Sequence, residues 1–166
     1  SALVRTVPAK GRGMALLAGS GGQSVAVSDS AGRAGLEMPR LADASYDQLK
    51  EFFNTIGGSY FNPFDMGGTI APTSARGREE NLQRILDILS ADPNLDAAIY
   101  EINAGGGGPN QDPERLNRML NAIASWRDGS WGKSLLMVMH PGTNPEAYAR
   151  SEEHTSELQS HLNLVC

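Results

Sequence analysis

A serine and two glycines, Ser20-Gly21-Gly22, end an apolar run near the start of the chain and precede small residues at helical spacing. Glycines let a ligand approach the backbone, and the first turn of a helix offers unpaired N–H groups and the positive end of the helix dipole. Gln23 and Ser24 would add side-chain donors in that turn. The pattern favours a phosphate or other anion site, but a short glycine turn between a strand and a helix also serves tight packing alone.

The same loop is close to the Gly-x-Ser-x-Gly elbow of serine hydrolases, which places a nucleophilic serine between a strand and a helix. Here Ala18 stands where the elbow has its first glycine. The chain order of Ser20, then Asp65 or Asp112, then His140 matches that of such enzymes. However, the expected sheet is small for that fold and His140 directly precedes Pro-Gly. These features disfavour the hydrolase, which stays an alternative.

Other loops at the same sheet edge hold further candidates, because ligands of open parallel sheets bind beyond the carboxyl ends of the strands. The loops expected there, besides the first, are Asn62-Pro63-Phe64-Asp65, the glycine run Gly105–Gly108, and His140-Pro141-Gly142. Asn62, Pro63 and Asp65 are candidates for a second binding loop. Asn-Pro and Asp are also common turn formers, so the motif by itself is weak.

Alternating strands and helices must position these loops. Continuous apolar runs predict buried parallel strands at 13–19, 96–104 and 133–140. Shorter strand segments are expected at 36–39 and just before Asn62. Helical spacing predicts helices at 23–34 ended by Gly35, at 45–56 capped by Ser45, at 77–91, and from Asp112 onward. The alternation predicts an α/β fold, an open parallel sheet with helices on both faces.

Composition excludes several classes of protein. The 166 residues suffice for one domain with a full core. A net charge of −5 argues against a nucleic-acid groove, and no apolar stretch approaches the roughly 20 residues that cross a bilayer. The single cysteine, Cys166, excludes an internal disulfide framework and fits a reducing compartment, so we expect a cytoplasmic protein with no membrane association.

The two ends of the chain differ from its middle. Residues 1–11 are expected to be a linker from an upstream domain, and 12–149 to be the α/β domain. Residues 150–166 have no clean helical or strand period and resemble a translated sequencing adapter. That resemblance implies that His154, His161 and Cys166 are not native and that the natural protein continues past about residue 149. The alternative is a genuine polar tail.

Five segments occur in an order that carries a family resemblance: "SGG", "AGLEMPRL", a leucine-containing helix, "NPFD" and "ILSADPNLDAAI". Through them, residues 8–145 resemble the flavodoxin-like carboxyl-terminal domain of NDP-forming acyl-CoA synthetases, relatives of succinyl-CoA synthetase and acetate–CoA ligase. This implies a three-layer flavodoxin-like fold. In that family a carboxylate, CoA and a nucleoside triphosphate yield an acyl-CoA through an acyl phosphate and a phosphorylated histidine.

The resemblance also implies roles for the two loops. Ser20, Gly21 and Gly22 match the helix start that helps to hold the phosphate of the phosphohistidine, and Asn62, Pro63 and Asp65 match the second loop. The histidine lies in a neighbouring domain, in an Ala-Ser-His-Thr-Gly-like motif that this sequence lacks. Ser20 is then a hydrogen-bond donor and not a nucleophile.

The whole enzyme of that family would need partners beyond this chain. They are upstream CoA-binding and phosphohistidine domains and an ATP-grasp domain or subunit, with CoA, ATP or GTP, and Mg²⁺. We expect this chain alone to be inactive, with no catalytic residue, bound cofactor or metal. The glycine run Gly105–Gly108 and the segment "DMGG" depart from the family pattern and leave the substrate open. A non-catalytic anion-binding or regulatory module is the alternative.

Overall fold

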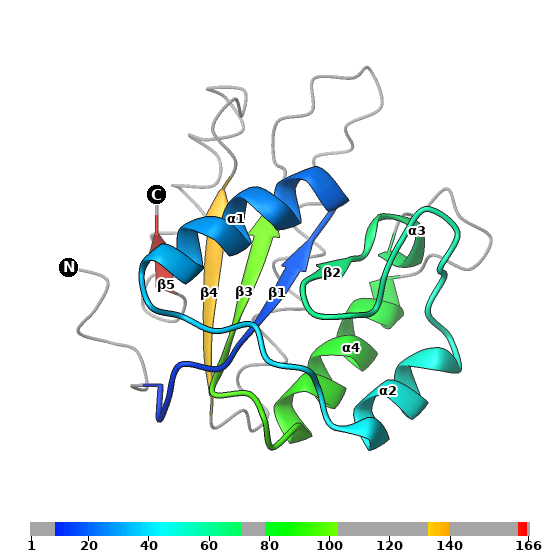
Figure 1. Cartoon of the computed structure of the whole chain (residues 1–166). Helices are drawn as coiled ribbons and strands as arrows, with labels where there is room; N and C mark the ends of the chain where they lie inside the picture. The colour runs from blue at the N-terminus through cyan, green and yellow to red at the C-terminus, as the bar shows by residue number, and fades with distance from the viewer. Residues whose placement is uncertain (1–8, 71–78, 103–132, 140–162, 166) are drawn as a thin grey trace.

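The computed structural model describes residues 9–70, 79–102, 133–139 and 163–165. Their elements, in chain order, are β1 (Met14–Ala18), α1 (Gly21–Arg33), α2 (Asp43–Lys50), β2 (Phe64–Asp65), α3 (Gly67–Ile70), α4 (Glu79–Ala91), β3 (Ala97–Ile102), β4 (Ser134–Met139) and β5 (Asn163–Val165). The strands form one sheet in the order β2-β1-β3-β4-β5, and every pairing is parallel (Figure 1).

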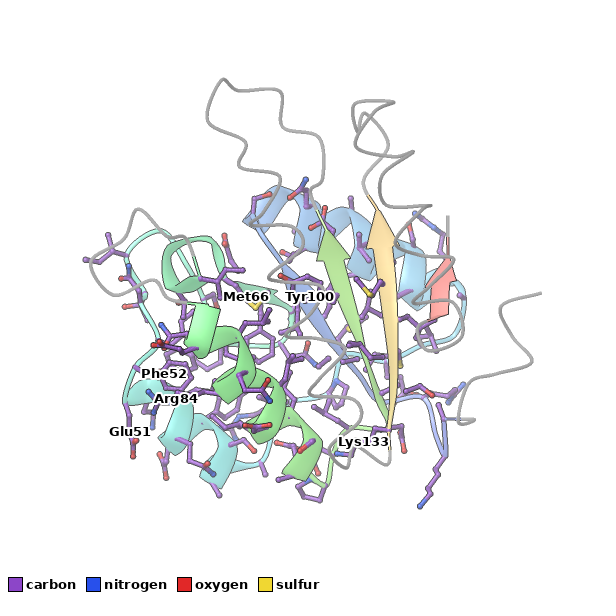
Figure 2. The ribbon with its side chains drawn as sticks, turned by 180° about the vertical axis from the view of Figure 1, so that it is seen from behind. Glu51, Phe52, Met66, Arg84, Tyr100 and Lys133 are labelled. Carbon is purple, nitrogen blue, oxygen red and sulfur yellow. The ribbon has the colours of Figure 1, made fainter. Side chains whose placement is uncertain are left out.

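Helices cover both faces of this sheet, with α1 on one face and α2 and α4 on the other (Figures 1 and 2). All of β1 is buried, and its side chains alternate between two clusters. Ala15 and Leu17 join the cluster under α2 and α4, whereas Met14 and Leu16 join the cluster under α1. A strand buried on both faces must be apolar throughout, which explains the unbroken run in the sequence. The predicted α/β, flavodoxin-like open parallel sheet is confirmed.

The predicted helical stripe in α4 is also confirmed. Leu82, Ile85, Leu86 and Leu89 are all buried in the larger cluster. Outside the core, Arg84 of α4 contacts the turn after α2 (Figure 2). Its guanidinium lies 3.9 Å from the centroid of the Phe52 ring and 3.9 Å from Glu51 Oε2.

The second helix differs from the prediction at its start and at its end. It runs from Asp43 to Lys50, and its cap is Ala42, with extended backbone. Ser45 lies inside the helix and is buried, so the prediction of a Ser45 cap was wrong. The reason is a distant contact: the Asp92 carboxylate accepts the N–H of Ala42 at 2.9 Å and holds the chain where the helix begins.

Two short strands also differ from the prediction. Residues 36–39 contribute only one isolated bridge, between Glu37 and Gly13, instead of a strand. The strand expected just before Asn62 lies after it, as β2. Both differences have the same reason. The Asn62 side chain occupies the carbonyl of Met14 and the N–H of Leu16 on this edge of β1, so no regular strand pairs with β1 there.

The carboxyl-terminal part of the chain adds an edge strand. β5 pairs with β4, so three residues of the segment that was expected to lie outside the domain join the sheet. The helix predicted from Asp112, the glycines Gly105–Gly108 and residues 140–142 lie outside the described residues, as do His154, His161 and Cys166. The adapter origin of the tail stays a prediction. No helix within the described ranges is long and apolar enough to span a membrane.

Lys133 joins the start of β4 to the end of α4. Its ammonium donates to the carbonyl of Leu89 at 3.2 Å and to the carbonyl of Asp92. Burial lowers the pKa of Lys133, against the opposing effects of the Asp92 and Asp96 carboxylates. The cation therefore adds hydrogen bonds to two carbonyls at and just after the end of α4, which also accept the N–H groups of Asp92 and Leu95.

We expect Lys133→Met to lower the free energy of unfolding by about 1 kcal/mol, the net contribution of hydrogen bonds from a partly exposed cation to a helix end. Urea denaturation would measure the change. Lys50→Met is the matched control, because Lys50 is exposed and its ammonium pairs with Asp47 on its own helix. The interpretation is contradicted if both variants lose equal stability.

Candidate functional site

The first candidate loop lies where β1 and β2 end together. Leu17 pairs with Phe64 and Ala18 with Asp65, so the two strands reach the carboxyl edge of the sheet in register. The N–H of Met66 donates to the carbonyl of Ala18 at 2.9 Å, directly after β2. The loops that leave the two strands therefore start in contact with each other.

Ser20 is the cap residue of α1, but its side chain does not cap the helix. The backbone is extended, with φ −155° and ψ 153°, and the hydroxyl makes no bond to a helix N–H. It donates instead to Gln23 Oε1 at 2.9 Å. The Ser24 hydroxyl is also committed, because it donates to the carbonyl of Gly21 at 2.7 Å and the residue is buried.

The free donors of this helix start are backbone N–H groups. The Ser20 carbonyl accepts the N–H of Ser24 at 3.1 Å, as the first bond of the helix. Within the described part of the chain, no acceptor takes the N–H groups of Gly21, Gly22 and Gln23. Three such groups at the positive end of a 13-residue helix form a suitable geometry for an anion.

A carboxylate lies beside these donors. A Cβ atom added to Gly21 would lie 3.3 Å from Asp65 Oδ2, whereas one added to Gly22 would meet nothing within 4 Å. The other oxygen, Asp65 Oδ1, accepts the N–H of Gly67 at 3.3 Å. The site therefore combines a helix N-terminus that favours negative charge with one fixed negative charge next to it.

Asn62 of the predicted second loop has a different position and different partners. Its side-chain amide donates to the carbonyls of Met14 at 2.8 Å and Pro39 at 2.9 Å. Its Oδ1 accepts the N–H of Leu16 at 3.0 Å. The side chain thus occupies the edge of β1 before β2 begins, and all its hydrogen-bonding atoms are engaged.

Of the second loop, only Asp65 lies beside the start of α1. Pro63, joined to Asn62 by a cis peptide bond, is half-buried between the two. Sequence reasoning gave Asn62, Pro63 and Asp65 one shared role, because nothing in the local pattern separates a ligand-facing polar residue from one that completes a sheet edge.

The hydrolase alternative receives no support from the described residues. The Ser20 hydroxyl is bonded to a neutral amide oxygen instead of a base. Asp112 and His140 lie outside the described residues.

A search of the described residues for a metal site finds no group of three or more His, Cys, Asp or Glu side chains that could hold a metal ion.

Sequence reasoning also missed the turn that supports the second loop. Gly67, at the start of α3, packs so closely on the first loop that an added Cβ would lie 2.8 Å from the carbonyl oxygen of Gly19. Thr69 of α3 is fully buried, with no exposed surface. The adjacent glycines in "DMGG" were the available signal for a close approach of two backbones.

Comparisons with known proteins give the fold a context. No family model matches the sequence, and no curated protein sequence matches it. A solved structure of PH0766 from Pyrococcus horikoshii OT3 aligns with 98% of this chain and 34% of that chain, at 20% identity and a TM-score of 0.69.

A second protein matches in two states. It is the dinucleotide-forming acetyl-coenzyme A synthetase 1 of Candidatus Korarchaeum cryptofilum. Its apo form gives a TM-score of 0.60, and its complex with phosphate and ADP gives 0.58. In both, the match covers 94% of this chain and 30% of that chain, at 16% identity.

These likenesses show a shared fold. This chain spans about a third of the length of the proteins that it matches. The larger part of each of those proteins therefore lies outside the match.

Proposed function

We propose that this chain is the flavodoxin-like domain of an NDP-forming acyl-CoA synthetase, and that it holds one side of a phosphoryl group during acyl-CoA formation. The observation that carries the proposal is the start of α1, with the free N–H groups of Gly21, Gly22 and Gln23 at the carboxyl edge of the sheet. The order of the sequence segments and the fold shared with an acetyl-CoA synthetase support it.

The helix start binds the phosphoryl oxygens mainly through its backbone. The N–H groups and the helix dipole act together, and both are already oriented before the ligand arrives. Ser20 Oγ contributes one further donor once it turns from Gln23 Oε1 to the ligand. Ser20 stays a donor throughout and forms no covalent bond.

Asp65 decides which kind of phosphoryl group fits. Its carboxylate, close to Gly21, repels a free phosphate dianion that binds at the same helix start. A phosphorylated imidazole has a second ring nitrogen, and when that nitrogen is protonated its N–H can donate to a carboxylate. The pair formed by the helix start and Asp65 therefore favours a phosphorylated histidine over inorganic phosphate.

The remaining parts of the reaction belong to other domains in this proposal. Upstream domains supply the CoA site and the histidine, and an ATP-grasp domain or subunit supplies the nucleotide site with Mg²⁺. This chain contributes no residue that reacts, so it is inactive by itself and works in the cytoplasm as part of the larger enzyme.

Titration of the isotope-labelled chain with two probes tests the proposal. The probes are inorganic phosphate and a phosphoryl-triazole, a stable mimic of phosphorylated imidazole. We expect both to shift the NMR signals of the Gly21, Gly22 and Gln23 amides, because both present phosphoryl oxygens to the helix start. Shifts confined to other residues contradict the site. Asp65→Asn, which removes the negative charge beside Gly21, should bind inorganic phosphate more tightly than wild type, and an unchanged affinity contradicts the role of Asp65.

Ser20→Ala separates this proposal from the hydrolase. We expect the variant to bind the mimic with an affinity lower by about 0.5–1.5 kcal/mol, the net contribution of one hydrogen bond. A serine-directed fluorophosphonate should leave the wild-type chain unlabelled, as mass spectrometry would show. Covalent labelling of Ser20 would support the hydrolase and overturn the proposal.

A further inference from the structure

A polar network lies behind the two loops of the candidate site, and the proposed function does not use it. The buried Thr69 hydroxyl accepts the N–H of Asn54 at 3.0 Å. The Thr69 carbonyl accepts the side-chain amide of Asn81 at 3.0 Å, and Asn81 is itself buried. The side-chain amide of Asn54 donates to the carbonyl of Gly68 at 3.1 Å.

The network joins three separate elements. Asn54 lies in the loop after α2, Thr69 lies in α3, and Asn81 lies in the first turn of α4. Asn54 Oδ1 also accepts the N–H of Ile56 at 3.0 Å, which closes the loop on itself. Because Thr69 has no exposed surface, water cannot take the place of a partner that Thr69 loses.

The turn Gly67–Ile70 is held by this network on one side and by the first loop on the other. A Cβ on Gly67 would lie 2.8 Å from the carbonyl oxygen of Gly19, and a Cβ on Gly68 would lie 3.1 Å from Asn54 Nδ2. The N–H of Gly67 also donates to Asp65 Oδ1. A displacement of the turn must therefore move the Asp65 carboxylate, or Gly19, or both.

We infer that Asn54, Thr69 and Asn81 are positioning residues that set the distance between the Asp65 carboxylate and the start of α1. The inference rests on the proposed function for its effect on binding. None of the three residues contacts the phosphoryl group; they act through Gly67 and Gly68. The site combines helix N–H groups with a carboxylate. Its preference for a phosphorylated histidine over inorganic phosphate is kept only while the turn Gly67–Ile70 stays in place.

Thr69→Val tests the inference, since valine keeps the shape of the side chain and removes its hydroxyl. In the ligand-free protein, the amide signals of Gly19, Gly21 and Gly67 should shift. The affinity for the phosphoryl-triazole should change about 3- to 10-fold, the range typical of residues that act on a site through others. Thr69→Ser, which restores an oxygen, should bring the affinity most of the way back to the wild-type value.

Thr55→Val is the matched control. Thr55 is adjacent to Asn54 in the same loop and is exposed, and its backbone carbonyl accepts the N–H of Gly58. It should leave the affinity unchanged. If Thr69→Val does not fold, Asn54→Ala carries the same test, because Asn54 is only half-buried and its loss removes the bond to Gly68.

The outcomes distinguish a failure of the positioning inference from a failure of the proposed function. If the wild-type chain binds the phosphoryl-triazole and Thr69→Val binds it equally well, the inference fails and the proposed function stands. A lower melting temperature with unchanged affinity of the folded protein also overturns the inference, since a merely structural role has that effect. If the wild-type chain binds neither probe, both the proposed function and the positioning role fail.

Discussion

Replacing Asn62 with alanine is expected to lower the free energy of unfolding by about 2–4 kcal/mol, because it leaves partly buried backbone groups without partners. The side chain donates to the carbonyls of Met14 and Pro39 and accepts the N–H of Leu16. Loss of a single partner for a buried polar group costs about 1–3 kcal/mol, and one substitution removes three partners. Urea denaturation followed by circular dichroism measures the change.

Asn94→Ala is the control for Asn62→Ala. Asn94 is exposed, and its side chain makes one hydrogen bond, to the carbonyl of Arg40 at 3.0 Å. Water can replace that bond, so the variant should lose well under half as much stability. Equal losses in the two variants would show that Asn62 does not hold the edge of β1 in the way that the structure indicates.

Replacing Gly22 with valine is expected to weaken binding of the phosphoryl-triazole by at least about tenfold while the fold stays intact. A Cβ at Gly22 meets no atom within 4 Å, so the substitution fits the folded chain. The branched side chain instead takes space beside the N–H groups that the phosphoryl oxygens must reach. Removing two charge-assisted hydrogen bonds costs several kcal/mol, so tenfold, about 1.4 kcal/mol, is a lower bound.

Gly32→Val provides the matched control on the same helix. Gly32 is also exposed and a Cβ there also meets nothing within 4 Å, but it lies in the last turn of α1, far from the free N–H groups. Both variants should keep the melting temperature within a few degrees of wild type. If Gly32→Val weakens binding as much as Gly22→Val, or if neither does, the ligand does not bind at the start of α1.

The structure agrees with the reason that the sequence suggested for Gly21 and Gly22, which is close approach of a ligand to the backbone. Among the described residues, positive φ occurs only at Gly35 and Gly57. Gly21 and Gly22 have ordinary helical backbone, so their value at this position is the space that they leave and not their conformational freedom. A side chain at Gly21 or Gly22 is disfavoured because it would exclude the ligand from the N–H groups.

Local chemistry was enough to determine the architecture. The apolar runs that became β1, β3 and β4 predicted interior parallel strands, because a strand between two helical layers is buried on both faces. Gly35 ends α1 as expected, with Leu36 N–H bonded to the carbonyl of Ala31 and Gly35 N–H bonded to that of Gly32. Such features depend on neighbours within a few residues, which the sequence displays directly.

Only the tertiary structure decided which polar residues lie at the candidate site. Asn62 bonds to groups 46 and 48 residues away in the chain, and Ala42 takes its partner from Asp92, 50 residues away. The position of Asp65 beside Gly21 and the contact of Gly67 with Gly19 depend in the same way on the pairing of β1 with β2. A residue's type shows that it can form hydrogen bonds, but the partner is set by the packing of distant segments, which no local pattern encodes.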